Sequence, residues 1–178
     1  RFPAPMAIHA VAHRCDFPFV KQLLARMASG AADSLCAGLR RVDSIAWLQG
    51  DLGLLDTLTE QEQEMNVKLA LASNMNRIQV FNVLRHVMEY GHAGGRRAAS
   101  RALSNFGGAE ANELVLEGLR DPDPEVQANM AVQLRERGIP GAMSHLIRLL
   151  DSPQELVAET VKTCLREFNF DRYTTVFD

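Results

Sequence analysis

Four residues near the start of the chain are of types that bind transition metals. His9 and His13 lie four positions apart, so on a helix their side chains share one face, and Cys15 and Asp16 follow closely. A zinc site needs three or four ligands, usually with a second ligand pair from elsewhere in the chain. The sequence offers no such pair. We therefore interpret the histidines as surface residues of a terminal helix, and we predict no metal site and no cofactor.

A glycine-rich stretch before two arginines is the second candidate for chemistry. Residues 91–97 read Gly-His-Ala-Gly-Gly-Arg-Arg, a turn that leads into a helix whose N-terminus could hold a phosphate. The stretch lacks the Walker pattern of glycines followed by Lys and Ser or Thr, and no strand precedes it. The pattern favours a turn between repeats with solvated arginines.

Nucleophilic and acid–base catalysis have no clear signature in the sequence. No serine lies in a Gly-x-Ser-x-Gly elbow. Most carboxylates fall in turns or in the first turn of expected helices, where they cap the helix and complement its dipole. We therefore predict that the chain is not an enzyme. The single tryptophan, Trp47, fits either core packing or a binding hot spot.

The elements that must position these residues follow a repeat. Apolar anchor residues recur at steps of 31 or 32 positions, at Ile8, Leu39, Leu71, Leu103, Leu134 and Leu165. A second apolar column follows 16 residues after each anchor, at Leu24, Leu55, Val87, Leu119 and Leu150. Both columns have apolar partners one helical turn away, so each repeat contains two amphipathic helices. A constant period between about 20 and 50 residues is typical of solenoids and related arrays.

The helix start and stop signals agree with this repeat. We predict no strands, and helices over 4–14, 17–29, 31–43, 45–57, 60–74, 77–90, 95–106, 110–120, 124–137, 140–150 and 154–168, with a further one from about 171. The pairs Thr59–Glu62 and Ser152–Glu155 predict capping boxes. Pro153 is expected at the first helical position, and Asp123 before Pro124 serves as an N-cap in the same way. Gly107 and Gly138 are expected in the left-handed conformation that ends a helix.

Composition restricts the classes of partner. Apolar residues make up 47% of the 178 residues and charged residues 23%, as in ordinary soluble domains, and no apolar run approaches the length of a membrane span. The three cysteines show no disulfide or metal spacing, which predicts a reducing, cytoplasmic setting. The net charge is −3, with 12 basic and 9 acidic residues in 1–108 (+3) and 7 and 13 in 109–178 (−6). A nucleic-acid-binding protein would show a basic stripe, so we predict no nucleic-acid or membrane partner.

Part of the sequence resembles a known family. Residues 95–103, Gly-Arg-Arg-Ala-Ala-Ser-Arg-Ala-Leu, followed by Gly107, resemble the first helix of a HEAT repeat, and 121–126 and 151–155 resemble the turn and helix start of later repeats. The similarity is clearest over 94–170 and is greatest to the short bacterial HEAT-like repeats also found in phycobilisome lyases. It implies an all-α fold, a right-handed α-solenoid of about six two-helix HEAT-like repeats with a period of about 31 residues, forming a single domain over 1–178.

HEAT proteins are mostly scaffolds and adaptors, so the resemblance implies a non-enzymatic, protein-binding role. In that family the second helix of each repeat lines the concave face, and the helical wheel then assigns positions 11 and 14 after each anchor to its exposed side. Charges of both signs with scattered apolar residues suit a protein or peptide groove. The predicted partner-binding residues are Phe19, Gln22, Asn82, Arg85, Leu114, Glu117, His145 and Arg148.

Two other functions remain open. One is an enzyme-associated role, as a lyase-like or DNA-glycosylase-like HEAT subunit, and the other is a passive structural spacer. The first anchor is only residue 8, and neither end of the array carries a recognisable polar cap, although solenoids need one. The sequence therefore predicts a section of a longer solenoid, or end-to-end contacts with another chain or a neighbouring domain.

Overall fold

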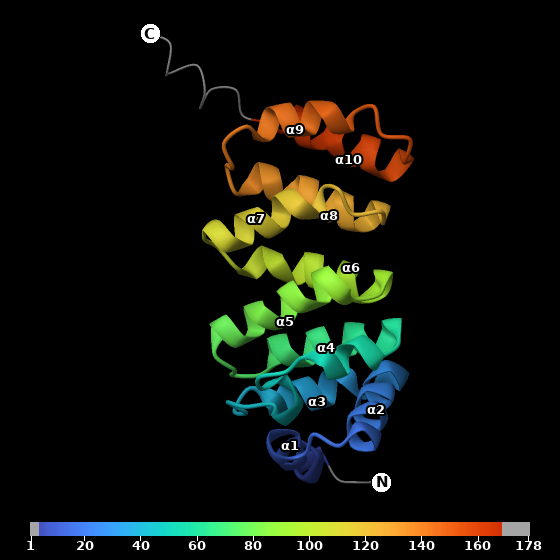
Figure 1. Ribbon diagram of the computed structural model, residues 1–178, viewed down its shortest axis with the longest axis vertical. Coiled ribbons are helices and arrows are strands. Elements are labelled where there is room, and N and C mark those ends of the chain that lie inside the picture. Colours follow the sequence, from blue (N-terminus) through green and yellow to red (C-terminus); the bar gives the residue numbers. More distant parts are fainter. Residues whose placement is uncertain (1–3, 169–178) are drawn as a thin grey trace. The chain divides into compact units, whose positions relative to one another are not determined.

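The computed structural model describes residues 4–168, and within them every regular element is helical (Figure 1). The all-α prediction is thereby confirmed, while the helix expected from about 171 lies outside the described residues. None of the described helices has the length and apolar character needed to cross a membrane. In chain order they are α1 (Ala4–His13), α2 (Phe17–Arg26), η1 (Met27–Ala31), α3 (Ala32–Leu39), η2 (Ala46–Leu48), η3 (Gly53–Thr57), α4 (Glu60–Ala72), α5 (Arg77–Tyr90), α6 (Ala93–Ala102), η4 (Leu103–Asn105), α7 (Ala109–Gly118), α8 (Pro124–Glu136), α9 (Ala142–Leu149) and α10 (Glu155–Arg166).

The chain folds into two compact units, unit 1 (Arg1–Phe106) and unit 2 (Gly107–Asp178). In unit 1, α4 packs between α3 and α6, and α5 contacts both α4 and α6. In unit 2, α10 packs on α8, and α9 contacts both. Each unit is therefore built by stacking the first helix of one repeat on the first helix of the next, as in solenoid proteins.

Three of the six anchors lie at the centre of the cores. Leu39, Leu103 and Leu134 are fully buried, whereas Ile8 and Leu165 are half-buried and Leu71 is 38% exposed. Leu71 belongs to α4, which is packed by α2, α3, α5 and α6 and therefore buries Leu69 and its other neighbours from several directions. The phase of burial in α4 is thus set by tertiary contacts as well as by the repeat.

Small residues allow the helices to approach closely. A Cβ atom at Gly38 would collide with the end of the Ile8 side chain, so glycine at residue 38 leaves room for Ile8 where α1 packs on α3. In unit 2, a Cβ atom at Gly118 would lie 2.6 Å from Cγ of Met130, where α7 meets α8. Interiors are packed too densely to absorb an added methyl group at such places without a shift.

Polar contacts between neighbouring repeats have the period of the sequence. They join residues 29 to 32 positions apart, which is one repeat: Asn74 with Asp43, Gln79 with Gln49, His86 with Asp56, His92 with Gln63, and Arg135 with Glu167. Within each unit, neighbouring repeats are therefore joined by polar side-chain contacts as well as by apolar packing.

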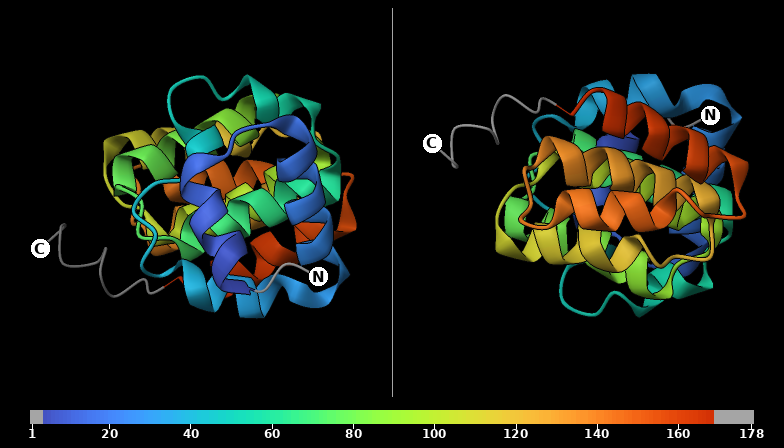
Figure 2. Two further views of the ribbon diagram at one scale, coloured as in Figure 1. Left: turned by 90° about the horizontal axis from the view of Figure 1, so that it is seen from below. Right: turned by 90° about the horizontal axis from the view of Figure 1, so that it is seen from above.

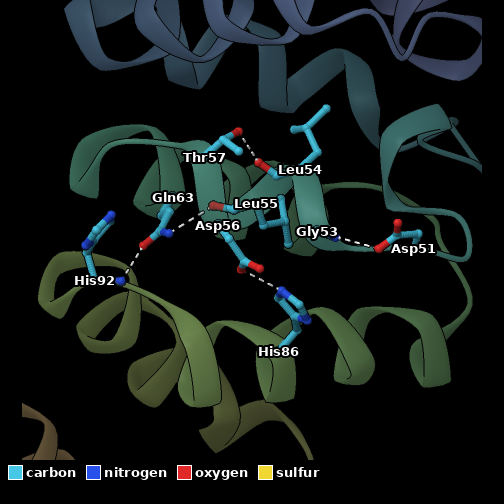
Figure 3. Close-up of polar contacts among 9 residues, drawn as sticks. All are labelled: Asp51, Gly53, Leu54, Leu55, Asp56, Thr57, Gln63, His86 and His92. Atoms are coloured by element: carbon cyan, nitrogen blue, oxygen red, sulfur yellow. Dashed lines mark hydrogen bonds and ion pairs between the residues drawn. The ribbon is translucent and has the colours of Figure 1, made fainter.

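The predicted helix over 45–57 is wrong. That segment forms η2 and η3, two short 3-10 helices, joined through Gly50 with φ of 72°. Asp51 also accepts a hydrogen bond from the Gly53 amide at 2.8 Å, which stabilises a turn (Figure 3). The predicted helix over 17–29 ends early, at Arg26, because Gly30 with φ of 119° kinks the chain between α2 and α3. The predicted helix over 31–43 ends at Leu39.

Two of the predicted caps are confirmed. Thr59 accepts a hydrogen bond from the Glu62 amide at 3.3 Å, and the Glu62 carboxylate accepts one from the Thr59 amide at 2.8 Å, which completes the capping box of α4. Asp123 caps α8 by accepting hydrogen bonds from the amides of Glu125 and Val126 at 3.0 and 3.1 Å. These caps fix where two first helices of the stack begin.

The other stop and start signals are displaced by one or a few residues. Ser152 accepts a hydrogen bond from the Gln154 amide at 3.2 Å, and α10 begins only at Glu155, so the second capping box and Pro153 as first helical residue are wrong. Gly138 has the predicted positive φ, of 61°, whereas near residue 107 the left-handed conformation falls on Gly108, with φ of 97°. Capping residues and glycines in the sequence thus predict where the turns lie, but they do not predict the residue at which each helix begins or ends.

The Asp123 cap gives a stability prediction. Asp123→Ala removes the acceptor for two amides of α8, and we expect it to lower the free energy of unfolding by about 1–2 kcal/mol. Asp151→Ala is the matched control, because Asp151 is exposed in the corresponding turn of the next repeat and changes the net charge equally. We expect that change to stay within about 0.5 kcal/mol. Urea unfolding of both variants checks this, and equal losses would argue against the cap.

Candidate functional site

The eight predicted partner-binding residues lie on α2, α5, α7 and α9, divided between the two units. Most are exposed or half-buried, but Leu114 is only 9% exposed. Leu114 was expected at the surface, but its side chain packs in the core between α7 and α8. The helical wheel misplaced it because burial on a short helix is decided by the neighbouring helices, which reach further round α7 than the wheel assumes.

In unit 1 the predicted residues form two separate groups. Phe19 and Gln22 lie on α2, which packs on α4 and η1, while Asn82 and Arg85 lie on α5. The repeat between α2 and α5 has no regular second helix, because η2 and η3 take its place. The α2 residues line a groove of their own, which contains no residue of α5.

The α5 face consists of Ile78, Asn82 and Arg85, spaced four and three residues apart on one side of the helix. Ile78 is 70% exposed, and Asn82 and Arg85 are exposed as well. Arg85 donates a hydrogen bond to the Asn82 side-chain oxygen at 2.9 Å, and its guanidinium lies 5.2 Å from the centre of the Phe81 ring. Asn82 and Phe81 therefore hold Arg85 on the surface, two helical turns from the exposed Ile78 on the same side of α5.

In unit 2, α9 presents a comparable surface, which we name the α9 face. Ile147 is about half exposed, Arg148 beside it is exposed, and His145 is half-buried. Glu117, on α7, is also exposed. Both α5 and α9 therefore combine an exposed isoleucine with an exposed arginine. The positions chosen from the sequence include the arginines but omit both isoleucines.

The α1–α2 groove has a volume of about 590 Å³ and an apolar floor that includes Phe19 and Leu23. The Arg14 guanidinium lies 4.6 Å from the centre of the Phe19 ring, and Trp47 meets the same ring edge-on with centroids 6.3 Å apart. The position of Phe19 is thus set by a cation on one side and by the core on another.

Trp47 belongs to the core. Its side chain is 3% exposed, and its indole Nε1 donates a hydrogen bond of 2.9 Å to the side-chain oxygen of Asn66. The Asn66 amide nitrogen is fully buried without a hydrogen-bond partner among the described residues. Of the two interpretations that the sequence left open for Trp47, the structure supports core packing, since a hot spot needs a surface.

The histidine pair of α1 lies at the surface. His9 and His13 are exposed with ring centroids 4.8 Å apart, and Cys15 is exposed in the following loop. Within residues 4–168, no group of three or more His, Cys, Asp or Glu side chains is arranged to hold a metal ion.

The glycine-rich stretch at residues 91–97 packs against α4 (Figure 3), and it is a turn only at Gly91 and His92, because α6 begins at Ala93. Gln63 is 1% exposed; it donates a hydrogen bond to the Leu55 carbonyl at 3.0 Å and accepts one from the His92 amide at 2.8 Å. A Cβ atom at Gly95 would lie 2.9 Å from the Cβ of Gln63, so the glycine lets α6 approach α4. Arg96 donates to the Gly91 carbonyl at 2.8 Å. The stretch therefore uses Gly95 and the His92 amide for packing between repeats.

A histidine–carboxylate pair joins η3 to α5, and the sequence analysis missed it. His86 Nε2 lies 2.8 Å from the Asp56 carboxylate (Figure 3). The centre of the imidazole ring is 4.9 Å from the centre of the Tyr90 ring. In the described part of the chain, no hydroxyl or thiol is hydrogen-bonded to this histidine, so the pair lacks the nucleophile of a catalytic triad. The separation of 30 residues, one repeat, is the signal that would have found it.

The three cysteines differ in reactivity. Burial raises the pKa of the Cys164 thiol and, in the same way, the pKa of the Cys36 thiol, although Lys68 opposes the shift at Cys36. Cys15 is exposed. Because the thiolate is the reactive form, buried thiols of raised pKa react slowly with alkylating reagents.

Stacked pairs of helices with a common period define this chain as an α-helical repeat protein. A family model of HEAT repeats matches residues 81–166, and this part of the chain belongs to the HEAT repeats. The prediction of an all-α solenoid of HEAT-like repeats is thereby confirmed. No curated protein matches the chain.

The contact between Gln63 and Gly95 can be tested by mutation. Gly95→Ala adds a methyl group against Gln63 and should displace its buried amide, lowering the free energy of unfolding by about 1–3 kcal/mol. Gly107→Ala is the control, because a Cβ atom there meets nothing within 4 Å and the φ is not positive. We expect that variant to be unchanged or slightly more stable. Thermal unfolding measures both, and equal stability of the two variants would contradict the packing role.

The thiols give a second prediction. With iodoacetamide at pH 8, we expect Cys15 to be modified first, Cys36 more slowly, and Cys164 only after unfolding in urea. The order follows from exposure and from the raised pKa values, since fewer molecules carry the thiolate at a given pH. Peptide mass spectrometry at successive times gives the order. Fast modification of Cys164 in the folded protein would show that its burial is wrong.

Proposed function

We propose that this chain is a non-enzymatic scaffold or adaptor that binds a protein or peptide segment. HEAT repeats are generally protein-interaction scaffolds, and residues 81–166 belong to them. Stacked repeats present extended surfaces made of equivalent helices, which suit long or flexible partners. The proposal also places the protein in the cytoplasm, because its cysteines, Cys15, Cys36 and Cys164, are free thiols.

The observation that carries the proposal is the composition of the α5 face. A 70% exposed isoleucine beside an ordered arginine and an asparagine provides an apolar anchor and directional hydrogen bonds within two helical turns. Protein interfaces are enriched in arginine and surround apolar contacts with polar groups. The α9 face repeats the combination in Ile147 and Arg148, on the second helix of a later repeat.

The experiment compares capture and affinity for four variants. Wild-type protein is used to recover partners from an extract of its source cell, and each purified partner is then titrated against Arg85→Glu, Arg148→Glu, Ile78→Ser and Arg40→Glu. We expect a loss of affinity of about tenfold for a charge reversal that faces the partner and a similar loss for Ile78→Ser. Arg40 is exposed at the end of α3 and belongs to neither face, so Arg40→Glu should bind normally.

Two results would contradict the proposal. Unchanged affinity of Arg85→Glu, Arg148→Glu and Ile78→Ser for every partner would remove these faces from the interface. Recovery of no partner at all would favour the passive spacer. Circular dichroism of each variant keeps a folding defect from being mistaken for lost binding.

A further inference from the structure

We propose that Tyr90, together with the carboxylates of Asp56 and Glu89, binds an arginine side chain of a partner protein. The Tyr90 site consists of these three residues and His86. The inference rests on the proposed role in protein binding and adds the chemistry of the partner to it. The site lies inside unit 1 on η3 and α5, and α5, drawn in green, contacts α4 before it and α6 after it (Figure 1 and Figure 2).

The aromatic part of the site is an exposed ring that the protein itself holds in place. Tyr90 is the last residue of α5 and is 58% exposed. The centre of its ring lies 4.9 Å from the centre of the His86 imidazole, with an angle of 48° between the planes. The imidazole is held in turn by the Asp56 carboxylate, 2.8 Å from Nε2 (Figure 3). The ring is therefore positioned before a partner arrives, which reduces the entropy lost on binding.

The charge around this ring is negative. A neutral imidazole that donates one hydrogen bond, as His86 does to Asp56, leaves the carboxylate with its charge. Glu89 is exposed, and within residues 4–168 neither carboxylate forms an ion pair with a lysine or an arginine. The pKa of Tyr90 is raised, first by its hydrogen bond to the Glu89 carboxylate and by the charge of that group, and to a lesser extent by the charge of Asp56. Both negative charges therefore act at the ring where a cation would bind.

Two arginines are close to Glu89 in the sequence, and other groups hold both of them. Arg85 precedes Glu89 by one helical turn and donates a hydrogen bond to the Asn82 side chain at 2.9 Å. Arg96 donates to the Gly91 carbonyl at 2.8 Å. Because Glu89 follows Arg85 by four residues, the Tyr90 site continues the α5 face toward the end of the helix. A partner that lies along α5 would meet both surfaces.

An arginine side chain fits this combination of groups better than other cations do. A guanidinium stacks flat on an aromatic ring and donates paired hydrogen bonds to a carboxylate, whereas the ammonium of lysine is a compact, strongly hydrated charge. A metal ion would need three or four ligands, and in the described part of the chain no group of three or more His, Cys, Asp or Glu side chains is arranged to hold one. The phosphates of a nucleic acid would be repelled by the two carboxylates.

The probe is a display library of random 16-residue peptides selected on the full chain at pH 8. We expect the enriched peptides to share an arginine. A synthetic copy should lose affinity about tenfold when that arginine is replaced by citrulline, which has nearly the same shape but no charge. Fluorescence anisotropy measures the affinities at several salt concentrations.

Variants of the protein show where the arginine binds. Tyr90→Leu removes the ring and should weaken binding about fivefold, whereas Tyr90→Phe keeps the ring and should bind nearly as well as the wild type. Glu89→Gln should weaken binding about threefold and reduce its dependence on salt. Glu113→Gln removes an exposed carboxylate of α7 and is the matched control, which should bind normally. Citrulline should cost less affinity with Tyr90→Leu than with the wild type, because the two changes remove the same contact.

Several outcomes would overturn the inference. These are selection of no peptide, enriched peptides without a shared arginine, equal binding of the arginine and citrulline peptides, or equal binding by the wild type, Tyr90→Leu and Glu89→Gln. Binding that is lost in Ile78→Ser and Arg85→Glu but not in Tyr90→Leu would place the peptide on the α5 face alone. That result would overturn the Tyr90 site while supporting the proposed function, so the failures of the two proposals can be distinguished.

Discussion

The close contact between α4 and α6 is the constraint on which the other elements of unit 1 depend. Gly95 lets the helices approach until Gln63 fills the space between them, and the buried Gln63 amide then satisfies the Leu55 carbonyl and the His92 amide. The Gln63 side chain therefore holds both η3 and the start of α6 in position against α4. A buried polar group is tolerated because both of its ends are paired, and removing either partner would leave it unsatisfied at a cost of about 1–3 kcal/mol.

This way of stacking decides which surfaces remain for binding. The first helix of a repeat packs against the first helices of the neighbouring repeats. For example, α4 contacts α3 and α6, and α8 contacts α10. The second helices α5 and α9 contact the first helices with one side only and leave the other to solvent. The architecture therefore leaves the isoleucine and arginine side chains of both helices exposed. A partner would recognise the protein through the chemical character of these side chains.

The sequence predicted the helical class, the period and most helices, because burial between repeats forces apolar residues to recur at fixed spacing. It failed over 45–57, where Gly50 and the Asp51 turn outweigh the apolar pattern. Leu114 was misplaced since a helical wheel cannot show how far the neighbouring helices reach round α7. The His86–Asp56 pair was missed because neither residue belongs to a motif within its own repeat.

The α1–α2 groove could not be derived from the repeat, because it results from a departure from it. An irregular second repeat leaves η2 and η3 where a full helix was expected. α2 packs instead on α4, where Lys21 forms an ion pair with Glu62 at 3.4 Å, and Phe19 rests against Trp47. Phe19, Leu23 and Arg26 of α2 line the groove together with residues of α1. Phe19 and Gln22, chosen as members of one row with Asn82 and Arg85, therefore line a separate groove with an apolar character of its own.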